Sequence, residues 1–402
     1  MTTTQADLGP DPAGEPGTTT SSGLAVETVD GVPPEPTHEE PGAHWEPDGE
    51  AAEADAEAAH WSEHHLLRSA VRWALVIGST IVIYSAFLLA KGADPFAVLR
   101  SMWDTALGNP DAIGETLIRS TPLLMAALAA AVPARAGLFN LGGEGQLLMG
   151  AIGAFLVANR LDGGAPSVPT LILMGLGGAA MGFLWAALPA LLKVITRTNE
   201  AISSLLLNYI AALVVTWLCF EPWKDPTSLG QAYSRELVDG ERFPVIWGAR
   251  VHAGIFVALV AAVVLWWLLR STTWGFKLRV VGGNSAAARR AGLAVGGLSI
   301  AAMGLGGALA GLGGMIEVAG TEGRLRPDLL VGIGFIGFLA SWLGRHDPLK
   351  ACLAALLLGA IAVGGSGLRI TAGLSGGAVN ILMALVLITV LGWGPRRTRS
   401  AD

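Results

Sequence analysis

The stretch Ser271–Gly292, which reads STTWGFKLRVVGGNSAAARRAG, is the most informative part of the chain. It lies between two long apolar runs and carries four basic residues, Lys277, Arg279, Arg289 and Arg290. A short basic loop of this kind is typical of the cytoplasmic side of a membrane. In its second half Asn284 or Ser285 can cap a helix and Gly292 can end it, with alanines between them. We therefore predict a small amphipathic helix here, which needs a partner to lie against.

The composition around this loop is that of a membrane protein. Of 402 residues, 52% are hydrophobic and only 14% are charged, well below what a soluble chain of this length carries. Residues 1–64 hold 15 of the 32 acidic residues and no Lys or Arg. The other 338 residues hold 17 acidic and 26 basic residues. The net charge of −6 therefore combines an acidic N-terminal extension with a basic membrane domain.

We predict three regions: a disordered acidic extension over 1–67, a membrane domain over 68–395 and a cytoplasmic tail over 396–402. The extension is rich in Pro, Gly and Thr and too poor in large apolar residues to offset the entropy of ordering it. It has no signal-peptide pattern. A solvated linker is the favoured interpretation, and a metal-binding tail is the alternative, since five of the seven histidines lie there: His38, His44, His60, His64 and His65.

Ten windows without Asp, Glu, Lys or Arg predict an all-α polytopic membrane protein with about ten transmembrane helices. Crossing a hydrocarbon core of roughly 30 Å takes about 20 helical residues, and the backbone in lipid must pair internally. The windows are Trp73–Ala90, Ser120–Ala134, Gly145–Asn159, Ser167–Leu192, Ala201–Phe220, Ala253–Leu269, Leu293–Ile316, Leu329–Gly344, Ala351–Leu368 and Ile370–Pro395.

The basic loops predict the orientation. With ten crossings, five basic clusters fall on one side, and the positive-inside rule makes that side the cytoplasm, with both termini inside. The clusters are Arg68 with Arg72, Lys193 with Arg197, Ser271–Gly292, Arg345 with His346 and Lys350, and Arg396 with Arg397 and Arg399. The connecting segments Lys91–Arg119, Glu221–His252 and Glu317–Asp328 then face outward.

The second and third windows are separated by PARAGLFNLGGEG, residues 133–145. A charged, glycine-broken segment at membrane depth should be unwound and buried in protein or line a cavity. We favour such a broken or re-entrant helix, and a tight cytoplasmic turn between two short helices is the alternative.

A short internal repeat is also visible. QLLMGAIGAFLVA at 146–158 is similar to DLLVGIGFIGFLA at 328–340, an offset of 182 residues. The offset predicts two four-helix units related by inverted topology, with one span between them, although chance likeness of glycine-rich segments is the alternative. Glycines recur within several windows, and we attribute them chiefly to close helix packing.

No nucleotide-binding GxxxxGK[ST], HExxH or paired CxxC motif is present, so the sequence favours neither ATP hydrolysis nor another enzyme activity. The polar residues near membrane depth remain as candidates for a translocation path. Glu144 and Glu200 could instead be structural, and Asn208 could simply bond a neighbouring helix. The candidates are Asn140, Glu144, Gln146, Asn199, Glu200, Ser204 and Asn208.

Four blocks occur here in the order typical of one family: GLFNLGGEGQLLMGAIGAF, NEAISSLLLNYIA, TTWGFKLRVVGGNSAAARRAGL and GIGFIGFLASWLGRHDP. Over roughly residues 68–395 the chain resembles the permease subunits of simple-sugar and nucleoside ABC importers. The resemblance implies a second permease, two cytoplasmic ATPase subunits, an extracytoplasmic binding protein and a bacterial inner-membrane location. It implies no nucleic acid and no cofactor on this chain, with ATP and Mg²⁺ on the ATPase.

The resemblance also implies that Ser271–Gly292 is the ATPase-coupling segment, in agreement with its charge. Gly282–Gly283 departs slightly from the family's usual single glycine. The implied coupling residues are Gly275, Phe276, Arg279, Gly282, Asn284, Ala288, Arg289, Arg290 and Gly292.

Three rival functions stay open. An ion-coupled secondary transporter should carry intramembrane carboxylates, which the ten windows lack. An exporter or channel component would work without an ATPase, and a membrane enzyme would need a catalytic cluster. Within the resemblance, nucleosides are the favoured substrates, followed by ribose-like sugars and then branched-chain amino acids.

Overall fold

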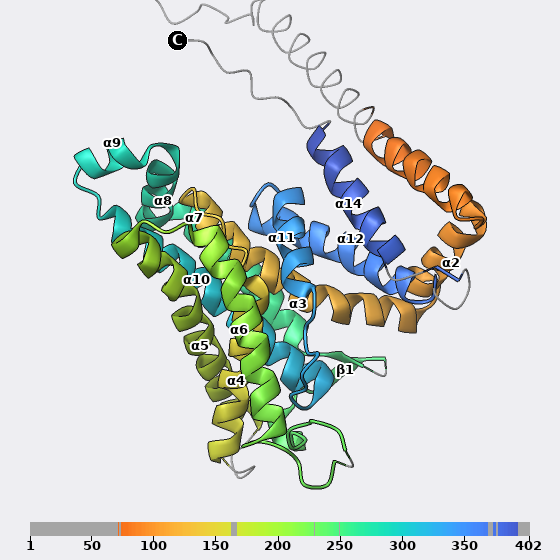
Figure 1. Cartoon of the computed structure of the whole chain (residues 1–402), viewed down its shortest axis with the longest axis horizontal. Coiled ribbons are helices and arrows are strands. Elements are labelled where there is room, and N and C mark those ends of the chain that lie inside the picture. The colour runs from red at the N-terminus through yellow and green to blue at the C-terminus, as the bar shows by residue number, and fades with distance from the viewer. Residues whose placement is uncertain are drawn as a thin grey trace, which may run out of the picture. The chain divides into compact units, whose positions relative to one another are not determined.

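The computed structural model describes residues 71, 74–161, 167–228, 230–248, 250–368, 373–374 and 377–392. The N-terminal extension with its histidines, the basic residues Arg68 and Arg72, and the tail 396–402 lie outside the described residues. The described chain is mostly helical (Figure 1). Its elements are a helix over Ala74–Ala90, α2 (Pro95–Leu107), α3 (Pro110–Arg135), α4 (Gly143–Leu161), α5 (Ser167–Thr196), α6 (Glu200–Phe220), η1 (Asp239–Glu241), β1 (Val245–Trp247), β2 (Val251–His252), α7 (Gly254–Ser271), α8 (Thr273–Gly283), α9 (Ser285–Arg290), α10 (Val295–Ile316), the π-helix η2 (Glu317–Glu322), α11 (Ile333–Leu343), α12 (Pro348–Ser366) and α14 (Gly377–Gly392).

Each predicted apolar window contains a helix, which confirms the helical class. Six described helices are long and apolar enough to cross a membrane, or seven if one bent pair forms a single span. That bent pair is Ala74–Ala90 with Pro95–Leu107, at 115°. Two predicted spans give shorter apolar helices, Ile333–Leu343 and Gly377–Val390. The number of ten crossings, the inverted repeat and the cytoplasmic termini therefore stay predictions.

Two segments differ from what the sequence indicated. The stretch 91–119, expected to connect two spans, holds α2 and the first turns of α3, because Asp94–Pro95 and Asn109–Pro110 both start helices. In the repeat, residues 146–158 are helical throughout, whereas 328–332 form turns ahead of α11. The two copies thus differ in local structure over their first five residues.

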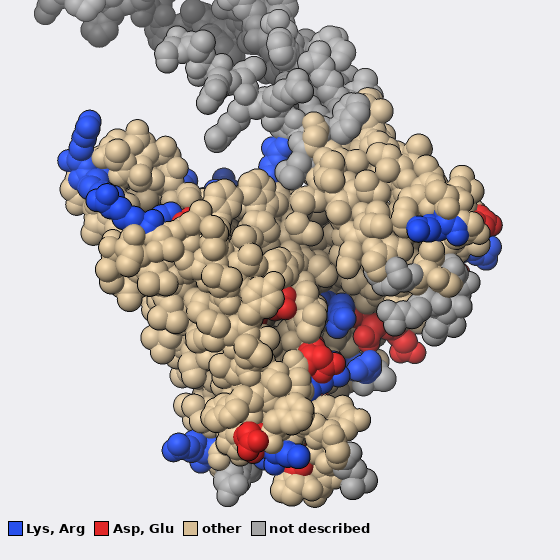
Figure 2. Space-filling model, in the orientation of Figure 1, with Lys and Arg blue, Asp and Glu red and all other residues tan. Residues whose placement is uncertain are grey.

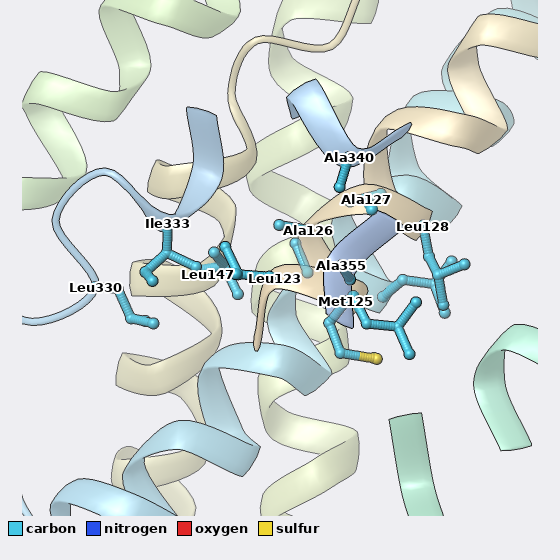
Figure 3. Close-up of a cluster of buried hydrophobic side chains, with 14 of the residues drawn as sticks. Leu123, Met125, Ala126, Ala127, Leu128, Leu147, Leu330, Ile333, Ala340 and Ala355 are labelled. Carbon is cyan, nitrogen blue, oxygen red and sulfur yellow. The ribbon is translucent and has the colours of Figure 1, made fainter. Parts of the chain in front are cut away.

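Helix α3 lies at the centre of the described core. It is buried along most of its length and packs against α10, α11 and α12. Figure 3 shows Leu123, Met125 and Leu128 of this helix among side chains from α4, α11 and α12. By contrast, α5, α6 and α7 expose large apolar side chains such as Leu184, Leu213 and Val260, as expected of helices that face lipid.

Glycines allow α4, α5 and α10 to pack almost backbone to backbone, as the sequence predicted. A Cβ added at Gly150 would lie 2.1 Å from the Cα of Gly311, and one added at Gly311 would lie 2.1 Å from the carbonyl oxygen of Gly178. A Cβ added at Gly182 would lie 2.2 Å from the carbonyl oxygen of Gly307. Small residues bring helices this close in lipid, where van der Waals contact replaces hydrophobic driving force.

Candidate functional site

The basic segment forms two short helices, α8 and α9, at one end of the bundle (Figure 1). Thr272 caps α8 by accepting a hydrogen bond from the backbone N–H of Gly275 at 3.2 Å. Asn284 caps α9 by accepting from the N–H of Ala287 at 2.9 Å, and Gly292 follows with φ +80°. The predicted capped helix is thus confirmed. The helix in the first half of the segment was not predicted.

The residues of this segment divide between two faces. Gly275 and Ala288 face the rest of the chain: Gly275 packs against the end of α7, and Ala288 is fully buried. Arg279 is exposed, although its guanidinium donates to the carbonyl of Leu269. Phe276, Arg289 and Arg290 face away from the rest of the chain. The side chain of Phe276 is 59% exposed. Figure 2 shows the Lys and Arg side chains gathered over this end, above a surface that is mostly uncharged.

The segment between α3 and α4 is unwound and partly buried. Residues 136–142 are not helical, yet Ala136, Leu138 and Asn140 are at most 6% exposed. We call these seven residues the break. Asn140 and Gln146 exchange two hydrogen bonds, of 2.9 Å and 2.8 Å, between their side-chain amides. Asn140 also donates to the carbonyl of Ala129 at 3.1 Å. The expected unwinding between the two helices is thus present, while the choice between a re-entrant helix and a tight cytoplasmic turn stays a prediction.

One face of α6 forms hydrogen bonds with the backbone of the break and of the first turn of α4. Glu200, Ser204 and Asn208 are spaced four residues apart, so their side chains point the same way from the helix. Their side chains accept hydrogen bonds from the N–H groups of Phe139 at 3.4 Å, Leu141 at 3.2 Å and Gly145 at 2.8 Å, respectively. Asn208 also donates to the carbonyl of Leu141 at 2.8 Å. These contacts satisfy buried backbone groups that the missing helix leaves without partners.

A lysine completes this network. Lys193, near the end of α5, places its Nζ 2.7 Å from Oε2 of Glu200, whose side chain is only 8% exposed. The ammonium group therefore compensates the charge of a nearly buried carboxylate. Asn199 lies beside the network but has another role, because its side chain accepts from the N–H groups of Ala201 and Ile202 and caps α6.

Glu144 joins the starts of two helices. It lies in the first turn of α4, and its Oε2 accepts a hydrogen bond of 2.9 Å from the N–H of Gly332, which precedes α11. A Cβ added at Gly334 would lie 2.2 Å from the N of Glu144, so the N-termini of α4 and α11 meet directly. A carboxylate is well placed there, since helix N-termini favour negative charge.

Arg135, the last residue of α3, connects the break to the turn between α11 and α12. Its Nη2 donates to the carbonyl of His346 at 3.0 Å. The Nδ1 of His346 lies 3.0 Å from Oγ of Ser341. Burial, and then the charge of Arg135, lowers the pKa of His346 to about 4. This histidine is therefore neutral at physiological pH.

The structure thus brings six of the seven path candidates together around the break, all but Asn199. Sequence reasoning missed the contributions of Lys193, Arg135 and His346. Lys193 and His346 had been assigned to basic clusters, which places them at the predicted cytoplasmic side but indicates no partner. Contacts at the break bring three of the five predicted cytoplasmic clusters, Lys193–Arg197, Ser271–Gly292 and Arg345–Lys350, to one region. Among the described residues no group of three or more His, Cys, Asp or Glu could hold a metal ion.

Comparison with known proteins assigns the chain to a family. Residues 112–391 match the family described as branched-chain amino acid transport system / permease component. The chain belongs to this family. The matched range begins in α3 and ends in α14, so it includes the break, the α6 network and the basic segment. The permease is therefore an integral membrane protein.

Two relatives share about a third of their residues with this permease. The glucose ABC transporter permease protein TsgB13 of Haloferax volcanii is 34% identical over 328 residues, which cover 79% of this chain and 86% of that protein. The guanosine ABC transporter permease protein NupP of Bacillus subtilis is 32% identical over 327 residues, covering 79% and 89%. A second guanosine ABC transporter permease protein of Bacillus subtilis, NupQ, is 26% identical over 292 residues, covering 69% and 89%. All three relatives are named as ABC transporter permeases.

Proposed function

We propose that this permease is the membrane subunit of an ATP-driven ABC importer in a bacterial cell membrane. The observation that carries the proposal is the basic segment, where α8 and α9 expose Phe276, Arg289 and Arg290 at the membrane domain's surface. The chain itself has no phosphate-binding loop. Aromatic residues and arginines are enriched in protein-binding hot spots, so a separate ATPase subunit would bind this segment.

Two copies of the ATPase, carrying ATP and Mg²⁺, would bind two permeases, and an extracytoplasmic binding protein would deliver the solute. The second permease could be identical or a paralogue. A paralogue is favoured by the two Bacillus subtilis relatives, which are both named as guanosine ABC transporter permeases. ATP binding would close the ATPases and shift the permeases between outward-open and inward-open states, because ATP binds one state more tightly than the other.

Nucleosides are the proposed solutes, with simple sugars second. The relatives named for guanosine and for glucose support these two classes. The polar candidates around the break are the proposed lining of the path. The second candidate function is an ion-coupled secondary transporter, since Glu144 and Glu200 lie at the break and could bind an ion.

Uptake into vesicles tests the two functions. The permease is purified with the subunits that accompany it and reconstituted, and entry of labelled uridine and labelled ribose is measured with and without ATP. Uptake that requires ATP and the ATPase subunits supports the importer. Uptake by the permease alone, driven by an ion gradient, would contradict the importer and support the secondary transporter.

A further inference from the structure

Two glycines form the contact between the basic segment and the break. Gly282 is in the last turn of α8, and Gly137 is the second residue of the break, with φ +73°. A Cβ added at Gly282 would lie 2.3 Å from the carbonyl oxygen of Arg135 and 3.1 Å from the N of Gly137. A Cβ added at Gly137 would lie 3.4 Å from the Cα of Gly282. The two backbones therefore touch with no side chain between them.

The break is bound on its other sides as well. Glu200, Ser204 and Asn208 hold its backbone to α6, and Asn208 also accepts from the N–H of Gly145 in the first turn of α4. Arg135, whose carbonyl touches Gly282, holds the α11–α12 turn through the carbonyl of His346. A displacement of α8 at Gly282 thus meets a segment already attached to α6 and to the α11–α12 turn.

We propose that Gly282 and Gly137 are positioning residues for transport, through which movement of the basic segment reaches the break and, through it, α6 and the α11–α12 turn. This inference rests on the proposed function. Its physical basis is the direct backbone contact. Repulsion between two backbones in contact rises steeply when one moves toward the other, whereas a long side chain between them would absorb a small shift by changing rotamer. Packed contacts of this kind move between discrete arrangements and do not deform continuously.

The neighbouring glycine provides a matched control. A Cβ added at Gly283 would have no atom within 4 Å, although Gly283 also lies in the last turn of α8. Gly282→Ala and Gly283→Ala therefore make the same change in helix propensity and hydrophobicity. They differ in whether the added methyl group meets the break.

Hydrogen exchange in the assembled complex tests the pathway without any substitution. Amide exchange is measured for a peptide covering 136–145, with and without a non-hydrolysable ATP analogue, in the permease bound to its ATPase subunits. We expect the analogue to change exchange in this peptide and in the α11–α12 turn. Unchanged exchange in both, in a complex whose uptake requires ATP, would overturn the inference and leave the proposed function standing. Uptake that needs no ATP would instead overturn the proposed function.

The glycine pair is then tested by coupling. For Gly282→Ala we expect ATP hydrolysis within about twofold of wild type but about tenfold less solute moved per ATP, a typical size for a coupling free energy. Gly283→Ala should match wild type in both readouts. Equal coupling in the two variants would overturn the proposal.

A second variant keeps the test decisive if Gly282→Ala does not assemble with the ATPase. Asn tolerates positive φ, so Gly137→Asn retains the turn while placing a side chain at the contact from the other side. We expect it to reduce the solute moved per ATP and to weaken the nucleotide-dependent change in exchange. Normal coupling in this variant would count against the proposal.

Discussion

Glu144 and Gly332 are 188 residues apart, yet the glutamate carboxylate accepts a 2.9 Å hydrogen bond from the glycine N–H. The bond joins the starts of α4 and α11, where the backbones are too close for a side chain at Gly334. The contact therefore fixes how the two helices meet beside the break.

Removing this acceptor should destabilise the permease. Glu144→Ala leaves the N–H of Gly332 without its partner, which costs about 1–3 kcal/mol when the group is buried. Glu144→Gln keeps an acceptor oxygen and should lose less. Thermal unfolding of the purified variants in detergent measures both, and equal stability of Glu144→Ala and wild type would contradict the prediction.

The α6 network should be sensitive to loss of Asn208. Asn208→Leu leaves the buried N–H of Gly145 and the part-buried carbonyl of Leu141 without this partner, and we expect a loss of about 2–4 kcal/mol. Ser203→Ala is the control on the same helix, because its hydroxyl bonds only the carbonyl of Asn199 at an exposed site. Chemical unfolding should rank Asn208→Leu well below Ser203→Ala, and a reversed order would rule out the assigned role.

Glycine packing between α5 and α10 should be strict. In Gly311→Ala the new methyl group would lie 2.1 Å from the carbonyl oxygen of Gly178, and such overpacking costs about 1–3 kcal/mol. Gly297→Ala lies on the same helix, where the nearest atom to the new Cβ is 4.0 Å away, and it should be neutral or slightly stabilising. Melting temperatures of the two variants provide the comparison, and the prediction fails if they are equal.

Charge reversal at the basic segment should leave membrane insertion of the permease intact while disrupting the coupling of ATP hydrolysis to uptake. Arg279→Glu combined with Arg290→Glu should leave the permease in the membrane but uncouple ATP hydrolysis from uptake. Arg290 is exposed, so Arg290→Glu alone should act through ATPase binding. Arg279→Glu also frees the carbonyl of Leu269 at the end of α7. Co-purification of the ATPase and uptake are the two readouts, and normal uptake by the double variant would exclude the role.

Stability should fall in mild acid. The pKa of His346 is about 4, below the ordinary 6.5, because burial and Arg135 disfavour the charged ring. As the pH falls, the imidazole of His346 is protonated in the unfolded chain before it is protonated in the folded chain. The free energy of unfolding is therefore highest above about pH 6.5 and decreases as the pH falls toward 4. Burial also lowers the pKa of His252 to about 4, so this histidine contributes to the same decrease of stability with falling pH. The melting temperature should drop less between pH 7 and 5 in His346→Asn than in wild type, and identical slopes would refute the assignment.

Sequence patterns located most helices of the fold because they depend on local signals. Charge-free windows marked the helices, and Asn284 and Gly292 marked the bounds of α9. The unpredicted α2 also has a local signal, since Asp94 followed by Pro95 is a standard helix start. Hydrophobicity alone could not fix the number of crossings, because α11 and α14 are apolar but short.

The arrangement of the site required the structure. The spacing of Glu200, Ser204 and Asn208 predicts one helix face, but nothing in the sequence indicates that this face binds the backbone of residues 139–145. Lys193 and His346 resemble any other basic residue of a cytoplasmic loop until their partners are known. The different surroundings of Gly282 and Gly283, adjacent and identical in type, are likewise visible only in three dimensions.

The attachment of the break has an evolutionary consequence. Glu200, Ser204 and Asn208 bind main-chain atoms, which every residue type except proline supplies. The side chain of Phe139, 50% exposed, takes no part in that attachment. That side chain stacks instead on Trp342 of α11, with the ring centroids 6.2 Å apart. Side chains of the break can then be exchanged without loss of its main-chain attachment to α6.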